Sequence, residues 1–187
     1  DAYGYYIYDD ADDAYSLVPR YTWFEIDPSY GGPGTDTDIY EPGDQGDSAI
    51  LNLPFVMQFY GEQYNQITVC SNGWAAPGVT EVEGFMNWHI PGPGGPSPMI
   101  AAFWDDLECT SGNVVYYNDS SNHQYIIEWS RLQNEYNNYE ETFQIIVPAV
   151  GTFEGVFSVD LEFGDDGKAT ASISLASKGK VTFTPAA

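Results

Sequence analysis

Carboxylates are the side chains of this sequence best placed to do chemistry. They gather at two points, one near the start of the chain and one after a short apolar run: Asp9, Asp10, Asp12 and Asp13, then Asp105 and Asp106. Ca²⁺ takes six to eight oxygen ligands and prefers carboxylates, so several of these side chains must converge to bind it. The spacing lacks the glycine and the glutamate of an EF-hand loop. We therefore expect either a calcium site of another geometry or two solvated acidic turns.

The charge balance bears on cofactors and partners. The chain has 28 acidic residues against five lysines and arginines, for a formal charge of −23. This charge repels itself in the folded state unless salt or bound cations screen it, although it also keeps a protein soluble. It repels nucleic acids and anionic membranes as well. We expect calcium as a cofactor and no nucleic-acid partner. We also expect Arg131, one of two arginines, to pair with one of the acids.

Catalytic patterns are weak throughout the sequence. A Ser-His-Asp hydrolase needs a nucleophile, a base and an oxyanion hole. The two histidines, His89 and His123, lie in loop-like stretches, and no Gly-x-Ser-x-Gly elbow occurs. A glycosidase needs two carboxylates, and Asp105 and Glu128 are among those that would serve, but such pairs arise by chance among 28 acids. We expect a protein that is not an enzyme.

The two cysteines follow neighbouring strand-like runs. A bridge between Cys70 and Cys109 would close a loop of about 40 residues and stabilise the fold by roughly 4 kcal/mol in the chain-entropy model. The alternative is two buried free thiols. A zinc site is not expected, because no histidine accompanies the pair.

Aromatic residues make up 16% of the chain, which excludes a disordered acidic protein. Apolar neighbours predict that three tryptophans pack in the core: Trp23, Trp104 and Trp129. The other two, Trp74 and Trp88, lie near turns together with Tyr30. These three rings are the candidates for an exposed platform that binds sugars.

The remaining pattern is that of β-strands. Short runs of β-branched and aromatic residues end at Gly, Pro, Asn or Asp, as in antiparallel sheets, at residues 67–70, 99–103, 113–117, 124–131 and 141–147. Two aromatic strands, 3–8 and 21–27, flank the first acidic cluster. Residues 28–48 and 75–98 are predicted loops, and in the first of them Asp36, Asp38, Asp44 and Asp47 offer further oxygen ligands.

Other signals refine this pattern. Pro54 makes the run 49–60 an edge strand or a bulged one, because proline cannot donate to a central ladder. Residues 71–73, Ser-Asn-Gly, predict a tight turn. Residues 149–187 contain three alternating runs and predict a β-meander, either the last strands of the same sandwich or a small appended sheet. No helical periodicity occurs, so we expect one all-β domain over residues 1–187, a two-layer antiparallel β-sandwich with long loops.

Five segments in this order resemble the NIDO domain of nidogen and of large secreted bacterial surface proteins. They are Cys-Ser-Asn-Gly-Trp at 70–74, Ile-Ala-Ala-Phe-Trp-Asp-Asp-Leu at 100–107, Val-Val-Tyr-Tyr at 114–117, Ile-Ile-Glu-Trp-Ser-Arg at 126–131 and Thr-Phe-Gln-Ile-Ile at 142–146. The resemblance covers about 80 residues, assigns residues 1–148 to a NIDO-like core and implies a non-catalytic extracellular module. The acidic aromatic start and the C-terminal meander depart from the family pattern.

These observations lead to two functional hypotheses. The first is an extracellular structural or adhesive protein that acts through protein–protein contacts, in its sharper form assembling with copies of itself by strand addition through residues 153–183. The alternative is a carbohydrate-binding module of a secreted protein. No apolar run of 18 residues is present, so we expect no membrane insertion. A chain that starts at Asp1 rather than Met suggests a processed mature protein.

Overall fold

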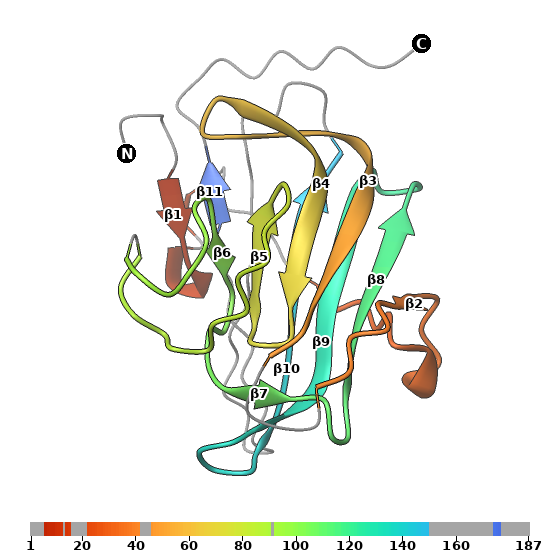
Figure 1. The fold of residues 1–187 in the computed structure, drawn as a ribbon. Coiled ribbons are helices and arrows are strands. Elements are labelled where there is room, and N and C mark those ends of the chain that lie inside the picture. The colour runs from red at the N-terminus through yellow and green to blue at the C-terminus, as the bar shows by residue number, and fades with distance from the viewer. Residues whose placement is uncertain are drawn as a thin grey trace.

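The structure is a computed structural model that describes residues 6–12, 14–15, 22–41, 46–90, 92–149 and 174–176, and it is a two-layer β-sandwich (Figure 1). The front layer has the strand order β3-β4-β5-β6. Its strands are β3 (Ser48–Phe59), β4 (Glu62–Cys70), β5 (Trp74–Pro77) and β6 (Ile100–Ala101). We call this layer the four-stranded sheet.

The second layer, the five-stranded sheet, has the order β10-β9-β8-β2, and β7 also pairs with β9. Its strands are β2 (Thr35–Asp36), β7 (Leu107–Glu108), β8 (Asn113–Asp119), β9 (Gln124–Asn134) and β10 (Glu140–Pro148). Two short 3₁₀ helices, Asp10–Asp12 and Pro28–Tyr30, accompany the sheets. No helix among the described residues is long and apolar enough to cross a membrane. The predicted all-β sandwich is confirmed.

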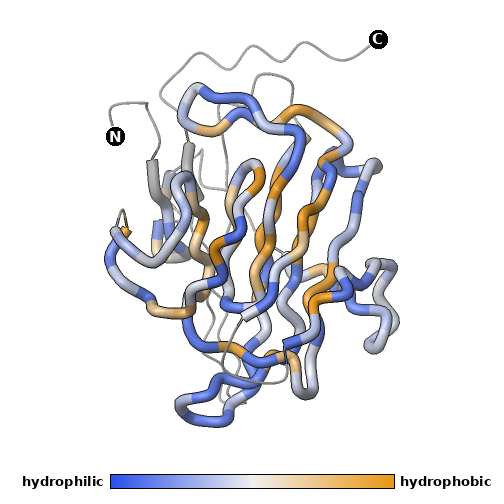
Figure 2. The backbone as a smooth tube through the Cα atoms, viewed as in Figure 1, coloured by the Kyte–Doolittle hydropathy of each residue, from blue (hydrophilic) through white to orange (hydrophobic). Residues whose placement is uncertain are grey.

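The core lies between the two sheets and is filled from their facing sides. Ile67 and Val69 of β4 meet Ile127 and Trp129 of β9 in one buried cluster. The Trp129 ring stacks on Phe143 with centroids 4.9 Å apart, and its indole N–H donates to the Cys70 carbonyl at 2.8 Å. Figure 2 shows the hydrophobic positions concentrated along these central strands. The indole therefore ties the two layers together through the core.

Each sheet also buries a small cluster on its outer face, the face turned away from the other sheet. Because side chains alternate along a strand, Cys70, Trp74 and Ala76 point away from the core and pack with Trp104. On the five-stranded sheet, Val115 and Ile126 pack in the same way against Ile26. Part of each outer face is thus covered by a loop rather than left to solvent.

Several strand predictions are confirmed. Pro54 lies in an edge strand whose register shifts between Asn52 and Met57, so it removes no ladder bond that the sheet needs. The turn at residues 71–73 joins β4 to β5, with Gly73 at a φ of 76°. The predicted strands 113–117 and 124–131 lie in β8 and β9, which pair in register from Asn113 opposite Ser130 to Asp119 opposite Gln124.

Other predictions were wrong. Residues 22–27 form no strand, because their backbone bonds to side chains of the five-stranded sheet instead of to a neighbouring strand. Trp23 is 36% exposed and lies outside the buried core. Residues 75–77, assigned to the loop 75–98, belong to β5. The C-terminal meander falls outside the described residues except for β11 (Ser174–Ala176), which pairs with β1 (Tyr6–Tyr8).

The bridge expected between Cys70 and Cys109 is not formed. Both cysteines are free and buried, Cys70 in the outer cluster beside Trp74 and Cys109 in the central core. The sheet separates the two side chains, so the alternative expectation, two buried free thiols, is the correct one. Burial raises the pKa of each thiol to about 12.

Candidate functional site

The β5–β6 loop, residues 78–99, covers the outer face of the four-stranded sheet and is anchored there by side chains. The indole N–H groups of Trp74 and Trp104 both donate to the carbonyl of Gly84, at 3.1 and 2.8 Å. The side-chain amide of Asn72 donates to the Glu83 carbonyl at 2.9 Å. The Ser48 hydroxyl donates to the Glu83 carboxylate at 3.0 Å. Four bonds therefore fix two adjacent residues of the loop.

Beyond this anchor the loop is open to solvent and carries large apolar side chains. In one stretch of twelve residues, 79–90, the following are exposed: Val79 (60%), Val82 (38%), Met86 (51%), Trp88 (49%) and Ile90 (52%). Single exposed apolar side chains are ordinary, but several in one segment indicate an interaction site. We call residues 79–90 the exposed stretch. In Figure 1 the loop that contains it projects at the left, between β5 and β6.

The loop folds back on itself, which gives the exposed stretch a defined course. A Cβ at Gly84 would overlap the Gly94 carbonyl, and a Cβ at Gly92 would overlap the His89 carbonyl. The Trp88 amide donates to the Met86 carbonyl at 2.8 Å. The glycines thus permit close backbone approaches that hold the apolar side chains on one compact loop.

The proposed sugar platform of Trp74, Trp88 and Tyr30 is not one surface. Trp74 is fully buried, because its ring lies between the sheet and the β5–β6 loop. This prediction was wrong. Tyr30 is 57% exposed, but the guanidinium carbon of Arg131 lies 3.2 Å from its ring centroid and covers one face. Trp88 alone keeps an open ring.

The first acidic cluster makes local turn contacts. Asp9 accepts from the Ala11 amide at 2.9 Å, and Asp12 accepts from the Asp9 amide at 3.0 Å. Asp10 lies in the first 3₁₀ helix, and its side chain, like Asp13, is outside the described residues. Among the residues that the structure describes, no three acidic, histidine or cysteine side chains are grouped to hold a metal ion.

The second acidic cluster lies in a crowded acidic region. Asp105 accepts from the Asp106 amide and from the Asn134 side chain, both at 3.0 Å. Nearby, the pKa of Glu108 is raised by burial, by a hydrogen bond to Glu135 and by the charges of Glu135, Glu41 and Asp106. Like charges therefore face one another at this end of the sandwich.

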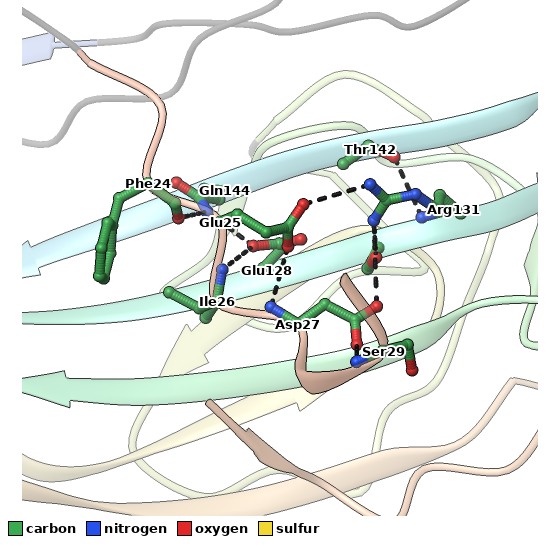
Figure 3. A network of polar contacts seen from close by, with 10 residues as sticks. Phe24, Glu25, Ile26, Asp27, Ser29, Glu128, Arg131, Thr142 and Gln144 are labelled. Atoms are coloured by element: carbon green, nitrogen blue, oxygen red, sulfur yellow. Dashed lines mark hydrogen bonds and ion pairs between the residues drawn. The ribbon is translucent and has the colours of Figure 1, made fainter. Parts of the chain in front are cut away.

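A second polar site lies on the outer face of the five-stranded sheet (Figure 3). A bulge shifts the register of β9 and β10 and places Arg131 at a φ of 56°, with its amide donating to the Thr142 hydroxyl at 3.1 Å. The Arg131 guanidinium pairs with Glu25 at 3.2 Å and with Asp27 at 3.9 Å. The expected ion pair of Arg131 is confirmed. The fully buried Glu128 belongs to the same site.

Comparison with known proteins identifies the family. The family described as NIDO related matches residues 21–187. The chain belongs to the NIDO-related family. No curated protein and no solved structure matches it. NIDO-related domains are typically extracellular, and NIDO-like domains generally make protein contacts.

The NIDO-like segments of this NIDO-related chain hold the scaffold together. The Phe103 amide donates to the Gly73 carbonyl at 3.0 Å, and the Leu107 amide donates to the Asn72 side chain at 3.1 Å. A Cβ at Gly73 would overlap the Phe103 carbonyl. The Ser-Asn-Gly turn and the Phe-Trp-Asp-Asp block are thus one structural unit. The exposed stretch lies between these two segments in the sequence, so the family motifs frame it without including it.

Proposed function

We propose that this chain is a non-catalytic extracellular module that binds a protein partner through the exposed stretch. The observation that carries the proposal is the exposure of Met86, Trp88 and Ile90 on a loop anchored at Gly84. An anchored loop loses little conformational entropy on binding, and Trp and Met are enriched at interfaces. Family membership supports an extracellular adhesive role.

Site-specific photo-crosslinking tests this proposal. A photoreactive amino acid is placed at Trp88 and, as a control, at Tyr136, an aromatic position that is 93% exposed in another loop. With the native extracellular fraction of the source organism, we expect discrete crosslinked protein bands from position 88. Equal yields and the same band pattern from both positions would refute the exposed stretch as the binding surface.

Self-assembly is the finer form of the proposal. Purified protein with the photoreactive group at position 88 forms a covalent dimer if a second copy is the partner. The strand addition expected of residues 153–183 lies outside the described residues, apart from β11, whose partner in the structure is β1 of the same chain. Light scattering from 1 to 100 μM separates the two cases, because assembly raises the particle mass above about 21 kDa.

Calcium stabilisation is proposed on the like charges around Glu108. Asp106, Glu41 and Glu135 raise its pKa, and a divalent cation nearby would relieve their mutual repulsion. We expect a higher melting temperature in millimolar calcium than in chelator, and a smaller increase in Glu108→Gln. Identical melting curves with and without calcium would remove this proposal.

The alternative, a carbohydrate-binding module, rests on the open ring of Trp88. A single tryptophan is a small platform, so we expect weak binding. A glycan array run with the wild type and Trp88→Ala distinguishes the two functions. Signals that disappear in the variant would favour the carbohydrate-binding module.

A further inference from the structure

Residues 22–34, here called the strap, cross the outer face of the five-stranded sheet (Figure 3). The strap is held by two side chains that bond to its backbone. Gln144 donates to the Phe24 carbonyl at 2.8 Å, and Glu128 accepts from the Ile26 amide at 3.2 Å. Beneath these bonds the Ile26 side chain packs on Val115 and Ile126. The strap thus covers an apolar part of the sheet.

Glu128 is fully buried at the centre of this contact. One carboxyl oxygen, Oε2, accepts from Gln144 at 2.7 Å and from the Ile26 amide. The other, Oε1, accepts no hydrogen bond from any described atom. A buried carboxylate with an unsatisfied oxygen is costly, whereas a protonated carboxyl turns that oxygen into a donor. The geometry therefore suits the neutral acid better than the anion.

Among the groups that face Glu128, the acidic ones favour the same protonation state. On the strap these are Glu25, which is hydrogen-bonded to Glu128, and Asp27, which lies in the same network (Figure 3). On β9 the nearby charge is Arg131, which is engaged by Glu25 and Asp27. On β10 the neighbour is the neutral Gln144. On β8 the outer-face neighbours are Val115 and the phenol Tyr117. No cation is paired with Glu128 in the part of the chain that the structure describes.

We propose that Glu128 is kept as a neutral acid that donates its proton to Glu25, and that loss of this proton loosens the strap from the sheet. An ionised Glu128 would place two carboxylates in direct contact, inside an apolar site. Glu25 would have to leave or the strap would have to lift, and either movement breaks the contacts of Arg131 or of Ile26. A lifted strap uncovers the apolar surface formed by Val115 and Ile126.

The pKa of Glu128 sets the pH at which this occurs. Burial raises this pKa, the hydrogen bond and charge of Glu25 raise it further, and the Gln144 and Ile26 donors lower it, with a result of about 8. Opening of the strap therefore becomes progressively easier as the pH rises from 4.5 to about 8. The strap acts as a clasp that responds to pH and controls access to an otherwise covered face.

Hydrogen exchange at matched pH tests the clasp. Glu128→Gln keeps an acceptor for Ile26 and Gln144 and supplies a permanent donor to Glu25, so it imitates the neutral acid. Amide exchange of residues 22–34 is compared between the wild type and this variant at pH 6 and pH 9. From a pKa of 8 in the closed form and 4.5 in the open form, wild-type protection relative to the variant should fall by about 100-fold. An unchanged ratio would overturn the proposal.

Two further measurements guard against misfolding of the variant. Glu140→Gln, a change at an exposed glutamate of β10, is the matched control and should follow the wild type at both pH values. A carbon-13 NMR titration of the wild-type carboxyl groups needs no variant. One glutamate should titrate near pH 8, whereas titration of every glutamate below pH 6 would overturn the proposal.

Discussion

The shared anchor of the β5–β6 loop predicts a specific departure from additivity. Trp74 and Trp104 donate to the same acceptor, the Gly84 carbonyl. In Trp74→Phe or Trp104→Phe the carbonyl keeps one donor. Each single change removes one hydrogen bond, about 1 kcal/mol, and leaves a small cavity, about 1 kcal/mol more. We expect each variant to lower the free energy of unfolding by about 2 kcal/mol.

The double variant removes both donors at once. The Gly84 carbonyl is then left without either indole, which adds roughly 1–2 kcal/mol to the sum of the single effects. The expected loss is therefore about 5–6 kcal/mol, with a coupling energy well above the error of additivity, about 0.5 kcal/mol. Urea unfolding followed by far-ultraviolet circular dichroism is the assay, because it does not depend on tryptophan fluorescence.

A control cycle shows whether the coupling belongs to the shared carbonyl. Trp104→Phe is combined with Tyr117→Phe, which lies in the outer cluster of the other sheet. These two effects should add. If the Trp74 and Trp104 effects also add to within 0.5 kcal/mol, the reasoning about a shared acceptor is refuted.

Three other predictions follow. Because the pKa of Glu128 is raised from 4.5 to about 8, the folded state binds a proton that the unfolded state has lost between these two pH values. The stability of the wild type relative to Glu128→Gln should therefore fall by up to about 1.4 kcal/mol per pH unit between pH 4.5 and 8. Denaturant titrations from pH 5 to 9 measure this difference, and the same pH dependence of stability in both proteins would contradict it. Gly73→Ala should cost about 3 kcal/mol or more, because the added Cβ meets the Phe103 carbonyl at a positive φ, and a melting temperature within 2 °C of wild type would contradict this. Cys70 and Cys109, with thiol pKa values near 12, should resist alkylation at pH 8 until the protein unfolds, and mass spectrometry would reveal early labelling of either thiol.

The fold was predictable where a run of β-branched and aromatic residues is closed by turn residues, or where a residue restricts the backbone. The β8–β9 hairpin and the edge strand with Pro54 are examples. β5 was missed because its sequence, Trp-Ala-Ala-Pro, has no β-branched residue and contains alanines and a proline, which are depleted in strands. Residues 22–27 have strand-like composition, but their partners are the side chains of Glu128 and Gln144. Contacts with residues so distant in the chain cannot be predicted from the local sequence pattern.

The candidate site was less predictable than the fold. Trp74 and Trp88 both lie near turns in the sequence, yet one is buried and the other exposed. The difference comes from the β5–β6 loop, which packs over Trp74 on the sheet, whereas its own residue Trp88 lies beyond the anchored part of the loop. Sequence analysis identified Trp88 but missed Met86 and Ile90. The sequence does not reveal the exposure of Met86 and Ile90, because this exposure depends on where Gly84 is anchored to the sheet.

The pairing of β1 with β11 has a mechanical consequence. Tyr6 lies opposite Ala176 and Tyr8 opposite Ser174. The first residue of β1 and the last residue of β11 therefore lie at the same end of this two-stranded ladder. A pull transmitted along the chain from both sides would load the ladder bond by bond and unzip it, rather than shear all its bonds together. Because a two-stranded ladder of three residues is weak, it would yield before either layer of the sandwich carried the load. Among the described parts of the chain, this small sheet would therefore be the first to open under tension.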